Sequence, residues 1–410
     1  MTKKIISNYA DLLIKVGVNL QKKEKLVISA PVIAADLVRE IANKAYKNGA
    51  REVEVLWNDE SLLRLDYKYR SMKSLAAVPE WEKLQREGFI EDRVCYIVIA
   101  SHDPEALKKV KTEKIATARR AKNLAFAKFR DYTSSNKIRW TIAAYPNKAW
   151  AKKVFPQDTA SAAMKKLWNA IIASVRLDAD NPMKAWEEHQ NNLQRRCKIL
   201  NDAKIKKLTY KNSIGTNFSV SMPKNYLFCG GAEEGALDGV MFTANMPTEE
   251  VFSSPERLSA NGKLVSAMPL CRNGQIIDNF WIEFKNGKII GYGAEKGYEN
   301  LKSIIESDEG SHYLGEIALV GYSSPIRNQG VLFYETLFDE NASCHFAIGD
   351  SYPNCVKNGG DMNEDELKAA GLNCSVEHVD FMVGTKDLSI VCETEDGKTF
   401  DVFKNGEWAI

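Results

Sequence analysis

A short segment near the end of the chain, residues 377–384 (EHVDFMVG), combines an imidazole and a carboxylate in a strand-like pattern. Successive side chains of a strand point to opposite faces, so His378 and Asp380 would share one face. An imidazole and a carboxylate about 7 Å apart along one face can share a metal cluster. A buried hydrogen bond between the two, or a half-exposed edge strand, would produce the same pattern.

Two apolar segments carry one polar side chain each. Residues 343–349 (SCHFAIG) place His345 in a strand-like context, where an isolated histidine is more often a core residue than a ligand. Residues 315–320 (GEIALV) place Glu316 inside an apolar run. Because a buried carboxylate is costly unless it is paired or bound to a metal, Glu316 is the more telling of the two.

Further carboxylates lie in segments that read as loops. Glu340, in residues 338–341 (FDEN), precedes His345 by five positions and could equally be a solvated charge. Glu249 and Glu250, in residues 245–252 (NMPTEEVF), follow a proline that favours a turn. Two acids there would also suit the first turn of a helix.

One tyrosine belongs to the same part of the chain. Tyr352, in residues 350–353 (DSYP), carries a phenol that could stabilise an oxyanion or move a proton beside a dication, although most tyrosines do neither. Taken together, the carboxylates and imidazoles suit two divalent ions with one bridging carboxylate. The candidate ligands are Glu250, Glu316, Glu340, His345, His378 and Asp380. The HExxH signature of single-zinc proteases is absent from the sequence.

The first half of the chain alternates strand and helix patterns. Continuous apolar or alternating runs at 25–31, 52–57, 95–100 and 139–145 predict strands, and 37–47 and 159–200 predict helices. Repeated strand–helix–strand units imply a largely parallel sheet covered by helices. The sequence therefore predicts an α/β N-terminal domain.

The second half changes character from about residue 206. It contains short strand patterns and four Asn-Gly pairs, which are strong hairpin signals. They lie at residues 261–262, 273–274, 286–287 and 405–406. We therefore expect an α+β C-terminal domain rich in antiparallel strands, with domains at 1–200 and 201–410.

Composition limits the classes of function. A chain of 410 residues with 44% hydrophobic and 27% charged residues fits a two-domain globular protein. A formal net charge of +2 gives no reason to expect nucleic acid or a membrane surface as partner. Eight scattered cysteines without a CxxC pair, and the lack of an apolar leader or spanning run, predict a cytoplasmic protein with reduced thiols.

Several motifs together resemble a known family. Residues 245–252, 323–353 and 377–384, with an opening at 9–31, resemble the aminopeptidase T/aminopeptidase S family of dimetal exopeptidases, peptidase family M29. The likeness covers nearly the whole chain and is looser between about 60 and 200. It implies a metal-dependent aminopeptidase that releases N-terminal residues from peptide substrates, working as a homodimer with an enclosed cavity.

The resemblance also assigns roles to residues. It makes the six candidate side chains ligands of two divalent ions, zinc or cobalt, with Glu316 shared between the ions and Tyr352 a catalytic side chain. A general base is not assigned, and Glu249 or another carboxylate free of metal could serve.

Three alternatives stay open. A related metallo-amidase or dipeptidase would share the site, and a non-catalytic scaffold would keep the fold without stoichiometric metal. An α/β enzyme binding a nucleotide or sugar phosphate would need a Gly-rich turn from strand to helix, and none of the early strands ends in one.

Overall fold

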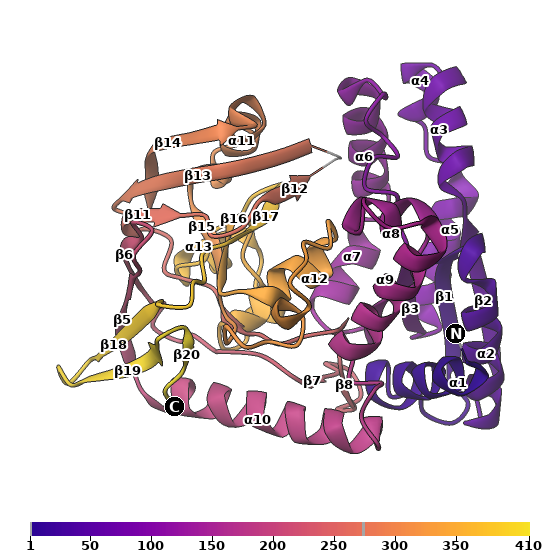
Figure 1. Cartoon of the computed structure of the whole chain (residues 1–410), viewed down its shortest axis with the longest axis horizontal. Helices are drawn as coiled ribbons and strands as arrows, with labels where there is room; N and C mark the ends of the chain where they lie inside the picture. The colour runs from indigo at the N-terminus through magenta and orange to yellow at the C-terminus, as the bar shows by residue number, and fades with distance from the viewer. Residues whose placement is uncertain (1, 273–274) are drawn as a thin grey trace. The chain divides into compact units, whose positions relative to one another are not determined.

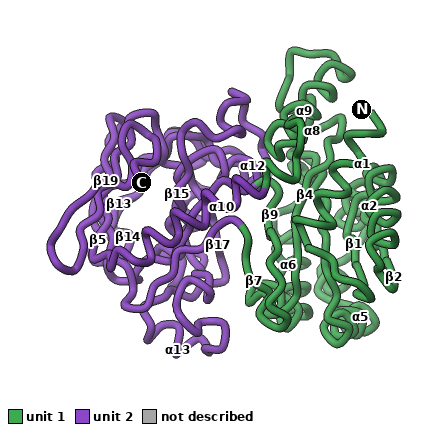
Figure 2. Tube along the Cα trace, turned by 90° about the horizontal axis from the view of Figure 1, so that it is seen from below, with its two compact units in different colours: residues 1–186, 232–247 green, residues 187–231, 248–410 purple. Residues whose placement is uncertain are grey.

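The chain folds into two compact units (Figures 1 and 2). A computed structural model describes residues 2–272 and 275–410. Unit 1 comprises Met1–Trp186 and Ala232–Pro247, and unit 2 comprises Glu187–Gly231 and Thr248–Ile410. The proposed division into domains 1–200 and 201–410 stays a prediction, because compact units are defined by contacts and not by independent folding.

Unit 1 is built on a five-stranded parallel sheet of order β2-β1-β3-β4-β9. Its strands are β1 (Lys25–Pro31), β2 (Glu52–Asn58), β3 (Cys95–Ala100), β4 (Trp140–Ala144) and β9 (Asn245–Met246). Strands β1 and β3 are buried along almost their whole length, which explains their continuous apolar sequences. The last strand, β9, is supplied by the segment that returns from unit 2.

Helices surround this sheet. They are α1 (Lys3–Leu12), α2 (Ala35–Lys47), α3 (Glu60–Tyr69), α4 (Met72–Leu75), α5 (Glu80–Glu91), α6 (Thr112–Ala125), α7 (Ala127–Ser134), α8 (Lys148–Val154) and α9 (Ala160–Ser174). Phe89 of α5 and Phe129 of α7 pack with Val27 and Tyr96 on one face of the sheet. The predicted α/β architecture is confirmed.

The helical stretch predicted at about 159–200 is divided into two helices in the structure. The side chain of Thr159 caps α9, which ends at Ser174. A second helix, α10 (Pro182–Asp202), begins at a proline, and proline favours the first position of a helix. The turn between them lies at 175–181, and its residues Val175 and Leu177 are buried.

The described residues of unit 2 form two antiparallel sheets. The larger has the order β12-β13-β11-β6-β5-β18-β19-β20, with β14 paired to β13. Its strands are β5 (Ile205–Lys211), β6 (Asn217–Ser221), β11 (Asn261–Val265), β12 (Leu270–Arg272), β13 (Gln275–Lys285), β14 (Lys288–Lys296), β18 (Ser389–Thr394), β19 (Thr399–Lys404) and β20 (Glu407–Trp408).

The smaller sheet has the order β10-β15-β16-β17. Its strands are β10 (Val251–Ser253), β15 (Leu314–Leu319), β16 (His345–Gly349) and β17 (His378–Met382). Phe346 lies 5.1 Å from Tyr210 and 5.2 Å from Phe218 between ring centroids, so the aromatic face of the small sheet packs on the large one. Short helices α11 (Tyr298–Ile305), α12 (Thr336–Asp339) and α13 (Glu364–Ala369) complete the unit.

Two of the four Asn-Gly pairs that predicted hairpins form them, one does not, and one is not described. Asn286-Gly287 joins β13 to β14 and Asn405-Gly406 joins β19 to β20, with positive φ at all four residues as this turn requires. The pair at 261–262 forms no hairpin, because both residues belong to β11 and pair with β6, where Gly262 lies close to the Asn217 carbonyl. The pair at 273–274 lies outside the described residues. Among the described residues, no helix is long and apolar enough to cross a membrane.

Candidate metal centre

The register of the small sheet gathers polar side chains on one face. Glu316 and Asp380 both pair with Ala347, and His378 pairs with Gly349. Directly paired residues point to the same face, as do residues two apart in one strand, so His345 joins this set. The residues between them, Ala347 and Gly349, are small and leave room above the sheet.

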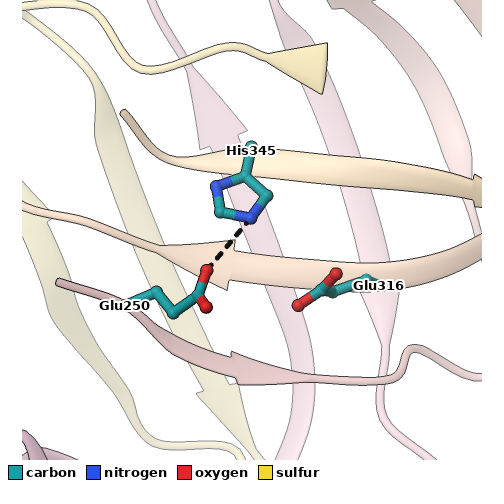
Figure 3. A group of neighbouring side chains, drawn as sticks. All are labelled: Glu250, Glu316 and His345. Carbon is teal, nitrogen blue, oxygen red and sulfur yellow. Dashed lines mark ion pairs between the residues drawn. The ribbon is translucent and has the colours of Figure 1, made fainter. Parts of the chain in front are cut away.

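Glu250 completes the first group of ligand atoms. It precedes β10, and its carboxylate oxygen Oε2 lies 3.2 Å from His345 Nε2. Glu250, Glu316 and His345 each offer a ligand atom within 4.8 Å of the others, and all three are buried. Figure 3 shows these three side chains pointing toward one another.

A second group shares Glu316 with the first. Glu316, His378 and Asp380 also offer ligand atoms within 4.8 Å of one another. His378 Nε2 lies 3.1 Å from Glu316 Oε2 and 3.3 Å from Asp380 Oδ1. The structure thus brings five of the six predicted ligands into two clusters joined by one carboxylate, which is the arrangement that two neighbouring cations require.

Both histidines are oriented by backbone carbonyls. His345 Nδ1 lies 3.0 Å from the Ser343 oxygen, and His378 Nδ1 lies 2.8 Å from the Asp350 oxygen. A carbonyl accepts only, so each Nδ1 carries the proton and each Nε2 faces the carboxylates. A second interaction that fixes the tautomer and the ring in this way is usual for histidines that bind metals.

Charge in the cluster is dense and poorly solvated. Burial, together with nearby Asp380 and Glu250, raises the pKa of Glu316, against the lowering effect of His378. Burial alone would lower the pKa of His345, but its hydrogen bond with Glu250 and neighbouring carboxylates raise it to about 10. The raised pKa values of Glu316 and His345 both show that added positive charge would stabilise this cluster, and dications would supply that charge.

Glu340 lies near the cluster without belonging to either group of ligand atoms. It begins the short 3₁₀ turn Glu340–Ala342 that leads into β16. Burial and the charges of Asp380 and Glu250 raise the pKa of Glu340 well above its usual range. The buried amide of Asn341, Nδ2, lies 3.4 Å from its Oε1. The carboxylate of Glu340 therefore interacts electrostatically with the cluster. Its role as a metal ligand stays a prediction.

Tyr352 lies at the edge of the same cluster. Its ring centroid is 4.9 Å from that of His378 and 5.6 Å from that of Phe252. The side chain is 36% exposed, so part of it reaches solvent. Desolvation and the carboxylates of Glu316 and Asp380 raise the pKa of Tyr352 well above its usual range. The phenol therefore stays protonated at neutral pH and can donate a hydrogen bond.

The structure does not bring Glu249 to the cluster. Both residues precede β10, but the side chain of Glu249 lies beside α10 whereas that of Glu250 lies beside His345. Glu249 Oε2 lies 3.8 Å from His189 Nε2 of α10, and the backbone N–H of Glu249 donates to Asn341 Oδ1 at 2.7 Å. This position argues against Glu249 as a general base.

Sequence reasoning missed Asn373. This buried side chain donates from Nδ2 to the carbonyl oxygens of Gly349 (2.6 Å) and Gly310 (2.8 Å). It thereby holds the end of β16 beside Asp350, whose carbonyl orients His378. Its loop position in residues 371–375 (GLNCS) carries no periodic pattern, so no local signal could have identified it.

A carboxylate–imidazole cluster on one face of an antiparallel sheet, with ligand atoms suited to two cations, defines a candidate metal-dependent enzyme. Comparison with known proteins makes the class specific. Residues 2–408 match the family described as "Thermophilic metalloprotease (M29)", and the chain belongs to this family.

Relatives support this assignment over the whole length. Aminopeptidase AmpS of Bacillus subtilis is 40% identical over 404 residues, which covers 98% of each chain. Aminopeptidase 2 of Geobacillus stearothermophilus is 39% identical over 99% of this chain and 98% of its own. Among solved structures, wild-type AmpT from Thermus thermophilus superposes with a TM-score of 0.92 at 31% identity, covering 100% of both chains. The family resemblance and the fold class predicted from the sequence are both confirmed.

Proposed function

We propose that the cluster on the small sheet of unit 2 holds two divalent metal ions and that the chain uses them to release N-terminal residues from peptides. The class of reaction follows from the family, whose description is a metalloprotease, and from whole-length relatives that are aminopeptidases. The chain is therefore a metal-dependent aminopeptidase. The observation that carries the site is the pair of ligand groups that share Glu316.

The donor set fits two cations. Glu250 and His345 would bind one ion, His378 and Asp380 the other, and Glu316 both, with Glu340 as the sixth ligand. Four carboxylates balance the charge of two dications, which a buried site needs. Oxygen and imidazole nitrogen donors without a thiolate suit zinc or cobalt. Bound there, the ions would supply Lewis acidity and lower the pKa of a coordinated water.

The chain's own residues would position the reaction. The Ser343 and Asp350 carbonyls hold the two imidazoles by their Nδ1 protons, so their Nε2 atoms stay available as ligands. The protonated phenol of Tyr352 can donate to the oxyanion that forms when the peptide carbonyl is attacked. Because Glu249 faces α10, we do not assign it as the base.

Release of free leucine from a short peptide with N-terminal leucine tests this function. The protein is assayed as purified, after chelation, and after zinc or cobalt is added back. We expect activity to disappear on chelation and to return with metal. A Glu316→Gln variant should bind less metal and lose activity, because it changes the shared ligand.

Two controls separate the alternatives. An N-acetylated peptide should remain uncut, whereas an amidase that ignores the free amine would cut it. Peptides of two to six residues distinguish a dipeptidase from an aminopeptidase. A protein that purifies without stoichiometric metal and releases no leucine under any metal condition would contradict the proposal and favour a scaffold.

A homodimeric, cytoplasmic enzyme is part of the same proposal. The dimer rests on the family resemblance, and light scattering on the eluting protein tests it. All eight cysteines lie in the described part of the chain and none forms a disulfide, which agrees with a reducing compartment.

A further inference from the structure

Unit 1 contains a cavity that the proposed reaction does not use. Its volume is about 740 Å³, within the range of small-molecule sites. Helix α3, the segment at 105–111 and the first turn of α6 line it. Lys114 of α6 connects the walls, since its ammonium donates to the carbonyl oxygens of Tyr67 (2.6 Å) and Arg70 (2.8 Å). The cavity is therefore a built feature of the unit.

The walls are strongly basic. Six cationic side chains face one carboxylate, that of Glu105; the cations are Arg64, Lys68, Lys108, Lys109, Lys111 and Lys114. Lys153 of α8, which is not a lining residue, lies 2.8 Å from Glu105 Oε1 and balances its charge. Among the described residues, Lys68, Lys109 and Lys111 form no ion pair. Arg64 lies 4.0 Å from Asp103 and Lys108 lies 3.6 Å from Glu105, so the positive charge that no carboxylate balances is that of the other lining lysines.

A helix N-terminus adds to this charge. Helix α6 is 14 residues long, and its cap residue Lys111 makes no side-chain hydrogen bond to the first turn. The helix dipole is equivalent to roughly half a positive charge at the N-terminus, and together with the uncapped N–H groups it favours an anion at this end. Because Lys111 and Lys114 both line the cavity, the first turn of α6 lies at its wall.

We propose that this cavity binds a compact small molecule that carries two or more phosphate groups. Lysine ammonium groups and helix N–H groups are the donors that phosphates prefer. The cavity is partly open to solvent, so a small molecule can enter it, and the apolar side chains of Ala106 and Val110 offer contacts for its uncharged part. This site lies in unit 1 alone and does not depend on the proposed peptidase activity.

Titration calorimetry on the metal-loaded full chain tests the proposal, with fructose 1,6-bisphosphate as the probe. We expect saturable binding that weakens about tenfold when one phosphate is removed, with fructose 6-phosphate, and that weakens on raising salt. The variant Lys109→Glu/Lys111→Glu should bind at least about tenfold more weakly. Both lysines are exposed, so the fold should be unaffected, which circular dichroism checks.

The matched control is Lys3→Glu/Lys4→Glu. These lysines are exposed on α1 in the same unit, and the variant changes net charge by the same amount. Binding that falls equally in both variants would show only a response to net charge and would overturn the proposal. So would the absence of saturable binding at about 5 mM probe. If the binding heat persists unchanged in the Lys109→Glu/Lys111→Glu variant, it comes from chelation of the metal by the probe, and this result would overturn the proposal. Tighter binding of an acidic peptide than of the probe would also overturn it and would point to a peptide ligand.

Discussion

At the scale of single residues, the small side chains beside the candidate ligands shape the metal-binding face as much as the ligands do. Glu316 and Asp380 flank Ala347 across the small sheet, and His378 lies opposite Gly349. A larger side chain at either position would occupy the space in which the carboxylates and imidazoles converge. On the opposite face, Phe346 and Phe381 pack in the core. One strand therefore supplies an apolar anchor and an open metal face by alternation alone.

The phenol of Tyr352 leads to a residue-scale prediction. Replacing Tyr352 by Phe removes the hydroxyl and keeps the ring contacts with Phe252 and His378. Because the phenol is a donor beside the cluster, we expect kcat to fall by roughly 10²-fold with metal content unchanged. Steady-state kinetics and metal analysis measure this. Tyr298→Phe, at an exposed tyrosine of the same unit, is the control, and an unchanged kcat in Tyr352→Phe would exclude the role.

At the scale of elements, one buried amide connects two loops to the end of β16. Asn373 donates to Gly349 and Gly310, and its Oδ1 accepts from Arg257 Nε at 3.0 Å. Its N–H donates to Ser351 Oγ at 3.1 Å. These bonds fix the chain on both sides of Asp350, the residue that orients His378.

Replacing Asn373 by Ala should therefore weaken metal binding. We expect the affinity for the more weakly bound metal ion to fall about 10- to 100-fold. A loss of this size is typical when a residue that holds a metal ligand in position is removed. Competition with a chromogenic chelator measures it. Asn363→Ala removes the capping box of α13 and should cost stability of about 1 kcal/mol while leaving metal affinity unchanged. Equal affinity in both variants would mean that Asn373 serves stability alone.

At the scale of the whole molecule, metal binding and folding of unit 2 are linked. The ligands come from separate segments around residues 250, 316, 340–345 and 378–380, so only the folded unit assembles them. Metal at about 100 times its Kd adds about 2.7 kcal/mol, or roughly 5–10 °C in Tm for a unit of this size. Thermal unfolding with and without chelator measures the difference.

The stabilisation by metal should also grow as pH rises. Without metal, the raised pKa of His345, about 10, contributes stability that is complete below its unfolded pKa and is lost as pH rises through the folded value. Because metal must displace this proton, its gain in Tm should be larger at pH 8 than at pH 6. A gain that shrinks with pH would contradict a metal site at His345.

The sequence determined the residue types, the strands and the family. Residues 25–31 and 95–100 are strands with the bounds that their apolar runs predicted, because strands buried on both faces need continuous apolar side chains. The motifs that resemble the M29 family predicted the family correctly. These features are local, so the order of residues is sufficient to show them.

Only the tertiary structure decided how distant segments meet. Alternation places His378 and Asp380 on one face of a strand, but only the pairing of β15, β16 and β17 brings Glu316 and His345 to that face. The basic cavity of unit 1 likewise joins α3, residues 105–111 and α6, and Asn373 acts through carbonyls far from it in sequence. Such contacts depend on register and packing between segments, which the pattern within any one segment does not encode.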